Sequence, residues 1–260
     1  MVFRLLTALV LAGMGCSSTT DESQSEGPEL VKITPVEPNE LPTALHFRDG
    51  SGRIEAEIGA RGVALVDING DGYLDATLTS TAGVRVLRGV GDGFFYDHPG
   101  DPLAVSNARG VAYADIEGDG DLDLYVSSST GDRLFVNDGG WFTDGTESRG
   151  LEQNDKNPGT DGVTFADIDS DGDLDLYVCH AMPAQADIVG GLPFGERGYP
   201  NRVYRNDGTG HFTAADEPVL SGIATGQSFM GVFFDHNHDG RTDILIVHDH
   251  HPDQLLQQTE

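Results

Sequence analysis

The chain has 260 residues and a formal net charge of −28, from 43 acidic and 15 basic residues. This length suits one or two domains with a hydrophobic core, and so acidic a surface argues against nucleic acid or an anionic membrane surface as a partner. The 35 glycines favour many short strands joined by tight turns.

Residues 1–15 are typical of an export signal peptide. Arg4 precedes an apolar run that is too short to span a bilayer in the mature protein. The segment ends Gly-Met-Gly before Cys16, which resembles the lipobox of bacterial lipoproteins, although Gly13 stands where leucine is usual. We therefore expect lipidation of Cys16 and a place in the bacterial cell envelope, in the outer membrane or periplasm, with the lipid anchor as the only membrane contact. The alternative is an ordinary signal peptide cut after Gly15, which gives a secreted protein.

Residues 16–42 are rich in Ser, Glu, Pro and Thr and carry few large apolar side chains. Such a segment buries too little surface to fold alone, so we expect a flexible linker. Residues 43–260 then form a domain built from an internal repeat. Cys179 lies in a strand-like run of this domain, and we expect a buried, unpaired thiol there.

Four acidic nonapeptides mark the repeat, at residues 67–75, 115–123, 167–175 and 235–243. In the third, Asp167, Asp169 and Asp171 alternate along a turning backbone, so their carboxylates can converge on one point. Asp173 can add a backbone carbonyl, and Asp175 closes the cage with another carboxylate. Ca²⁺ takes six to eight oxygen ligands and suits such a set. Acidic turns without metal are the alternative, but turns do not require this many carboxylates four times over.

Each nonapeptide lies between two strand-like segments. The first strands are predicted at 62–66, 110–114, 162–166 and 231–234, and the second strands at 76–78, 124–126, 176–178 and 244–247. In the second and third units, a third strand follows and ends in Asn-Asp-Gly, which favours a hairpin turn, before a fourth strand that carries an aromatic residue. Four strands in roughly 45–50 residues are typical of a propeller blade.

Together these motifs resemble the FG-GAP/VCBS repeat, which integrin α-subunit propellers share with many bacterial secreted proteins. The resemblance covers about residues 43–260 and implies an all-β fold, a β-propeller of four-stranded blades with Ca²⁺ in the acidic loops. The side-chain ligands that it implies are Asp67, Asn69, Asp71 and Asp75; Asp115, Glu117, Asp119 and Asp123; Asp167, Asp169, Asp171 and Asp175; and Asp235, Asn237, Asp239 and Asp243. The backbone carbonyls that it implies belong to Tyr73, Asp121, Asp173 and Arg241.

Two loops depart from the family pattern. Glu117 has a longer side chain than the Asp or Asn usual at its place, so it either moves the ion outward or binds it through water. The fourth loop carries His236, His238 and Arg241, and this positive charge predicts the weakest calcium site there.

The number of blades depends on how the ring closes. Four loops predict four blades, and the last has a third strand at 254–257 but no outer strand. Either the segment 43–47 closes a small ring, or the propeller is incomplete; we expect the second, which leaves open an association with other chains that completes the ring. The insertion 181–201 is either a recognition loop or a segment packed over a neighbouring blade.

For function, the sequence favours a binding or adhesion module for a protein or glycan ligand, with structural calcium. We expect no enzymatic activity, because the chain has no Gly-x-Ser-x-Gly or His-Glu-x-x-His motif and its acids are committed to the loops. The alternatives are a non-catalytic part of a larger secreted propeller enzyme or hydrolase, and a structural role in which partner chains complete the propeller.

Overall fold

The computed structural model describes residues 60–99, 103–151, 159–180, 200–215, 227–249 and 252–259. Within these ranges all regular elements are β-strands, and no helix is long and apolar enough to cross a membrane. The predicted signal peptide, Cys16, the linker 16–42 and the segment 43–47 lie outside the described residues, as does most of the insertion 181–201.

The strands form four antiparallel sheets, each in simple chain order. The first contains β1 (Gly62–Val66), β2 (Asp75–Ser80), β3 (Gly83–Gly89) and β4 (Phe95–Asp97). The second contains β5 (Ala108–Ala114), β6 (Asp123–Ser128), β7 (Arg133–Asp138) and β8 (Trp141–Asp144). The third contains β9 (Thr160–Ala166), β10 (Asp175–His180), β11 (Arg202–Asn206) and β12 (Phe212–Ala215). The fourth contains β13 (Gln227–Phe234), β14 (Asp243–Asp249) and β15 (Gln254–Leu256).

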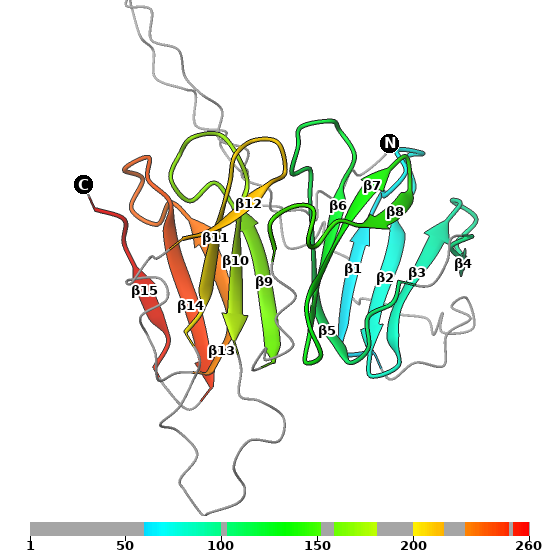
Figure 1. Cartoon of the computed structure of the whole chain (residues 1–260), viewed down its shortest axis with the longest axis horizontal. Coiled ribbons are helices and arrows are strands. Elements are labelled where there is room, and N and C mark those ends of the chain that lie inside the picture. Colours follow the sequence, from blue (N-terminus) through cyan, green and yellow to red (C-terminus); the bar gives the residue numbers. More distant parts are fainter. Residues whose placement is uncertain are drawn as a thin grey trace, which may run out of the picture.

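The sheets stand side by side as consecutive blades of a β-propeller (Figure 1). Their first strands contact one another in chain order, β1 with β5, β5 with β9, and β9 with β13. The prediction of an all-β propeller with four-stranded blades is confirmed. The prediction that the last blade lacks an outer strand is also confirmed, because the fourth sheet has three strands among the described residues.

The hydrophobic core lies between the blades rather than within them. One cluster of buried side chains joins the first and second blades, a second joins the second and third, and a third joins the third and fourth. The middle strands β6 and β10 are buried along their whole length because they have a blade on each side, and this explains the Leu-Tyr-Val run that both contain. Cys179 lies in β10 with its thiol buried and unpaired, as predicted.

Glycines allow the blades to approach each other closely at the innermost strands. A Cβ atom added to Gly62, Gly110 or Gly162 would lie under 3.0 Å from the backbone carbonyl of Arg109, Asp161 or Phe229 in the following blade. Met230 stands at the equivalent position of the fourth blade, five residues before the first aspartate of the loop. The close approach, and not a backbone conformation, therefore requires glycine at these three positions.

The substitution Gly162→Ala should lower the free energy of unfolding by roughly 1–3 kcal/mol, because backbone cannot yield to the new methyl group as a flexible side chain can. Met230→Ala is the matched control at the equivalent position, where the side chain is half exposed, and it should change stability by less than about 1 kcal/mol. Urea unfolding of both variants measures the difference. Equal effects of the two substitutions would contradict this account of blade packing.

Candidate metal centres in the acidic loops

Each acidic loop begins at the end of a first strand and is closed by hydrogen bonds to its own first aspartate. In the first loop, Asp67 Oδ1 accepts a hydrogen bond from the Asp71 amide at 3.1 Å, and Oδ2 accepts one from the Gly72 amide at 2.8 Å. The first aspartates of the other loops accept equivalent bonds from their own fifth and sixth residues. The glycine at the sixth position has φ between 82° and 100° in all four loops, a region that side chains disfavour. The four loops therefore share one backbone geometry.

The third loop brings three carboxylates together. Asp167, Asp169 and Asp171 each offer an oxygen, and these oxygens all lie within 4.8 Å of one another. Ligands placed 2.3–2.6 Å from one Ca²⁺ ion lie at about such separations. An all-oxygen donor set of three negative charges thus fits calcium in both chemistry and spacing, and without a cation these charges would repel one another.

The first and fourth loops present an amide at the third position instead of a carboxylate. Asn69 Oδ1 accepts a hydrogen bond from the Asp71 amide, and its Nδ2 donates to the Asp71 carboxylate. Asn237 makes the same two bonds with Asp239. These loops therefore keep the oxygen-rich arrangement with one negative charge fewer than the third loop.

The ninth aspartate of each loop lies beneath the others. Asp75, Asp123, Asp175 and Asp243 are all 0–1% exposed. In the first blade, Asp75 Oδ2 accepts a hydrogen bond from the Ile68 amide at 3.1 Å, and Oδ1 accepts one from the Gly89 amide at 2.8 Å. The other blades repeat both bonds. This carboxylate joins the loop to the end of the third strand, a role that sequence reasoning missed, and its predicted role as a metal ligand remains a prediction.

A model of the FG-GAP-like repeat matches residues 67–126, 115–178 and 185–246, which include all four acidic loops. The chain belongs to the FG-GAP-like repeat family. Two of the matches begin at the first aspartate of a loop, at residues 67 and 115, and the third begins at residue 185. All three end within the second strand of a blade, in β6, β10 and β14, so the family pattern and the blade pattern coincide.

Two solved structures are similar to this FG-GAP chain. One is an Agrocybe aegerita lectin described as recognising non-reducing terminal N-acetylglucosamine, at 24% identity and a TM-score of 0.38, with 70% of this chain and 45% of the lectin covered. The other is the pore of the Photorhabdus luminescens Tc holotoxin, at 18% identity and a TM-score of 0.38, with 77% of this chain and 9% of the toxin chain covered. The chain thus spans less than half of either structure. No curated protein matches it.

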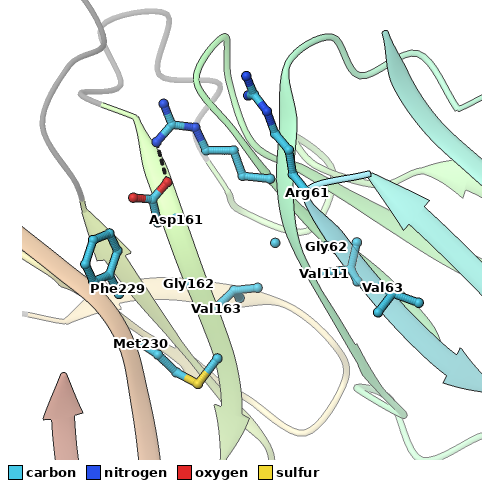
Figure 2. Close-up of a pocket in the computed structure, with 11 residues that line it drawn as sticks. Arg61, Gly62, Val63, Val111, Asp161, Gly162, Val163, Phe229 and Met230 are labelled. Atoms are coloured by element: carbon cyan, nitrogen blue, oxygen red, sulfur yellow. Dashed lines mark hydrogen bonds and ion pairs between the residues drawn. The ribbon is translucent and has the colours of Figure 1, made fainter. Parts of the chain in front are cut away.

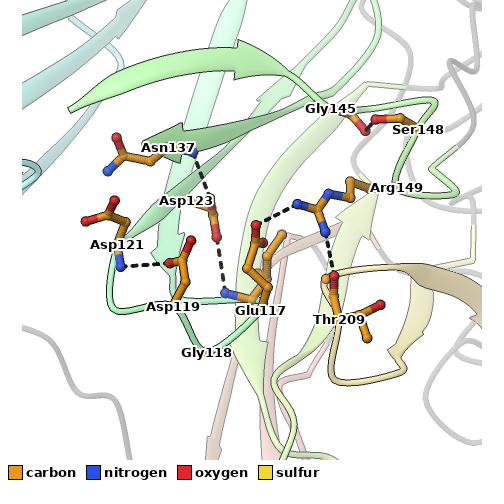
Figure 3. A network of polar contacts seen from close by, with 12 residues as sticks. Glu117, Gly118, Asp119, Asp121, Asp123, Asn137, Gly145, Ser148, Arg149 and Thr209 are labelled. Atoms are coloured by element: carbon orange, nitrogen blue, oxygen red, sulfur yellow. Dashed lines mark hydrogen bonds and ion pairs between the residues drawn. The ribbon is translucent and has the colours of Figure 1, made fainter. Parts of the chain in front are cut away.

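The second FG-GAP loop differs from the third because an arginine engages its third residue. Arg149 Nη2 lies 2.6 Å from Glu117 Oε1, and Arg149 Nη1 donates to the Thr209 carbonyl of the third blade (Figure 3). Glu117 Oε2 is buried and has no hydrogen-bond partner among the residues that the structure describes. Arg149 thus connects Glu117 to the third blade, and Asp115 and Asp119 are left as the carboxylates at the mouth of this loop.

Arginines also lie beside the other three loops. Arg88 Nη2 is 3.1 Å from Asp71 Oδ2, and Arg205 Nη1 is 2.6 Å from Asp175 Oδ2 and 3.5 Å from Asp169 Oδ2. In the fourth loop, Arg241 Nη2 is 2.6 Å from Asp239 Oδ2, and the backbone amide of Arg241 is the main reason that the pKa of Asp239 is lowered. Each arginine offsets part of the charge of its loop.

Sequence reasoning missed Arg88 and Arg205, although their equivalent positions in the repeat could have indicated them. Arg88 and Arg205 occupy the same place, immediately before the residue whose amide binds the ninth aspartate. The seventh positions, in contrast, were predicted for their backbone carbonyls. Their side chains have local roles, since Asp121 Oδ2 accepts a hydrogen bond from the Gly139 amide at 2.7 Å and Arg241 Nε donates to the Gln258 carbonyl at 3.1 Å.

The gain in melting temperature that calcium provides should grow as the pH rises from 5 to 7. Burial raises the pKa of Asp123 to about 6, and burial also raises the pKa values of Asp75 and Asp175. A raised pKa means that the folded, metal-free protein binds these protons more tightly than the unfolded chain, so this contribution to stability is lost as the pH rises through about 6. Calcium favours the deprotonated loops, and below pH 6 each pH unit costs about 1.4 kcal/mol of binding free energy for a group like Asp123. Melting curves with calcium and with chelator at each pH measure the gain; a gain that is constant from pH 5 to 7 would contradict the prediction.

Proposed function

We propose that this FG-GAP chain is a calcium-stabilised propeller module that binds a protein or glycan ligand outside the cytoplasm. The observation that carries the proposal is the triad of Asp167, Asp169 and Asp171, whose oxygens already gather within the span of one calcium coordination sphere. Calcium in this place is structural in our proposal, since the loop around it joins the first and second strands of the blade.

The connection from the loop to the rest of the blade supports a structural role. The carboxylate of the ninth aspartate accepts hydrogen bonds from the amide of the second loop residue and from the amide at the end of the third strand. Asp175 accepts them from Ile168 and Asn206. An ion that orders the loop therefore orders three of the four strands of a blade. Extracellular calcium modules bind with Kd values of roughly 10⁻⁴–10⁻³ M, which suits the export that residues 1–15 predict.

In our proposal, the ligand binds the loops at the blade ends. Propeller loops vary in length without disturbing the strands, and long loops on a rigid scaffold often carry recognition. In our proposal, a lipid on Cys16 keeps the module at the cell envelope. Mass spectrometry of the mature N-terminus tests that part separately, and an unmodified Cys16 would contradict it.

Asp171→Ala should weaken calcium binding more than Asp239→Ala. The third loop has three carboxylates at its mouth, whereas the fourth has Asn237 in place of one of them and Arg241 bound to another. Calcium titration calorimetry of the two variants measures the loss: Asp171→Ala should remove a site that the wild type fills early, and Asp239→Ala one that it fills late.

Asp97→Asn is the control for this titration. Asp97 is an exposed aspartate outside the loops, paired with Arg85 at 2.6 Å, so its substitution should leave the number of calcium sites unchanged. The calcium proposal would be wrong if the wild type took up no calcium at millimolar concentration, or if Asp171→Ala bound as much calcium as the wild type.

A further inference from the structure

A cavity of about 540 Å³ opens where the first strands of all four blades begin. It is lined by Arg61, Gly62, Val63, Arg109, Gly110, Val111, Asp161, Gly162, Val163, Phe229 and Met230 (Figure 2). The acidic loops follow the other end of the same strands, after Val66, Ala114, Ala166 and Phe234. The cavity is therefore separate from the candidate metal centres, and its volume lies within the range of small-molecule sites.

Comparison of the four repeats separates what the fold requires in this cavity from what it does not. Gly62, Gly110 and Gly162 recur because the next blade touches them. The residues just before them, together with Phe229 in the fourth blade, occupy one equivalent rim position, and there the chain has Arg, Arg, Asp and Phe. Blade packing does not explain this variety, since Gly62, Gly110 and Gly162, which follow the first three rim residues, all make the same contact with the backbone of the next blade.

The charges at the rim do not balance. Arg109 forms an ion pair with Asp161 (Figure 2). Arg61 is exposed, and within the described residues no carboxylate pairs with its guanidinium. Among the described residues that line it, the cavity therefore has one more positive than negative group, on a protein whose formal net charge is −28.

The remaining wall is apolar and open to solvent. Val63 is 63% exposed, Met230 is 50% exposed and Phe229 is 43% exposed. Exposed apolar side chains that surround a cavity with one uncompensated charge are typical of a ligand site.

We propose that this central cavity binds a small organic monocarboxylate. Its carboxylate pairs with Arg61, beside the Arg109–Asp161 pair, and its apolar part covers Val63, Phe229 and Met230. A guanidinium binds a carboxylate through two parallel hydrogen bonds. A monoanion matches the one guanidinium, that of Arg61, that has no carboxylate partner among the described residues of the cavity, whereas a dianion would bring an uncompensated charge to an acidic protein.

Nuclear magnetic resonance of ¹⁵N-labelled, calcium-saturated protein tests the proposal, with 4-phenylbutyrate as the probe and its neutral amide, 4-phenylbutanamide, as the comparison. The acid should shift the amide resonances of Gly62, Gly110 and Gly162 with a Kd of about 1–10 mM, the affinity expected for a fragment of this size. The amide should bind at least about tenfold more weakly, because it lacks the charge-assisted bonds.

Arg61→Gln should reduce the affinity for the acid to that for the amide, and its exposed position means that the fold should be retained, which a melting curve verifies. Arg85→Gln is the matched control, since Arg85 is an arginine of the same blade that lies outside the cavity and pairs with Asp97. Equal binding of acid and amide would overturn the proposal, as would an acid preference that survives Arg61→Gln or is lost with Arg85→Gln. Shifts confined to residues outside the cavity, or no shifts up to 20-fold the expected Kd, would overturn it too.

Discussion

Removal of calcium should lower the melting temperature of this protein by about 10 °C or more. A site held at 100 times its Kd adds about 2.7 kcal/mol to the free energy of unfolding, and each kcal/mol corresponds to about 2–4 °C for a domain of 150–250 residues. The chain has four such loops, and two of them occupied at this level already account for a shift of about 10 °C or more. Differential scanning calorimetry in calcium and in excess chelator measures the effect.

Magnesium serves as the control for this experiment. It is smaller, requires a near-ideal octahedral site and loses its water reluctantly, so it should restore little of the lost stability. Melting curves that coincide in calcium and chelator would contradict a structural role for the ion. Full recovery in magnesium would show instead that any divalent charge near Asp167, Asp169 and Asp171 is sufficient.

Asn206→Ala should be among the most destabilising single substitutions in the chain. Asn206 is 5% exposed, and its Nδ2 donates to the Leu174 carbonyl of its own blade at 3.2 Å and to the Ile116 carbonyl of the preceding blade at 2.8 Å. Its Oδ1 accepts bonds from the amides of Gly208 and Gly210. The substitution leaves buried backbone groups unsatisfied, each at a cost of roughly 1–3 kcal/mol, so we expect a loss of about 2–5 kcal/mol in urea unfolding.

The fourth blade provides a matched control for Asn206. Gln258 takes the equivalent place there, since its amide binds the ninth aspartate, Asp243, and its Nε2 reaches the Ile168 carbonyl of the preceding blade at 3.5 Å. This contact is long and partly exposed, so Gln258→Ala should cost less than about 1 kcal/mol. If the two substitutions cost the same, the bond from Asn206 to the neighbouring loop would not be the reason for its effect.

The Asn206 contact also explains a motif that the sequence alone assigned to another cause. The Asn-Asp-Gly run was predicted as hairpin chemistry, and the turn is present, with Gly208 at a φ of 77°. Yet the asparagine itself is buried and spans two blades, as Asn137 does between Leu122 and Ile68. Sequence reasoning treats a motif locally and cannot find a partner that lies 90 residues away.

In the candidate sites, too, contacts within one loop were predictable from the sequence and contacts with distant residues were not. The first, third and fifth loop positions were predictable because they alternate along one short turn, and the structure brings Asp167, Asp169 and Asp171 together as that spacing implies. Glu117 was expected to differ through its length alone. Its actual partner is Arg149, from a distant turn, and nothing in the spacing of the loop indicates that arginine.

The sequence by itself determined the repeat, the strands, the turns and the acidic composition of each loop, because all of these depend on residues within one blade. Only the tertiary structure decided which side chains face a neighbouring blade. It buried the ninth aspartates under the loops, pressed Gly62, Gly110 and Gly162 against the next blade, and placed Arg61, Arg109, Asp161 and Phe229 around one cavity. The physical reason is that these groups meet through the packing of one sheet on another, and such contacts join residues that no local pattern connects.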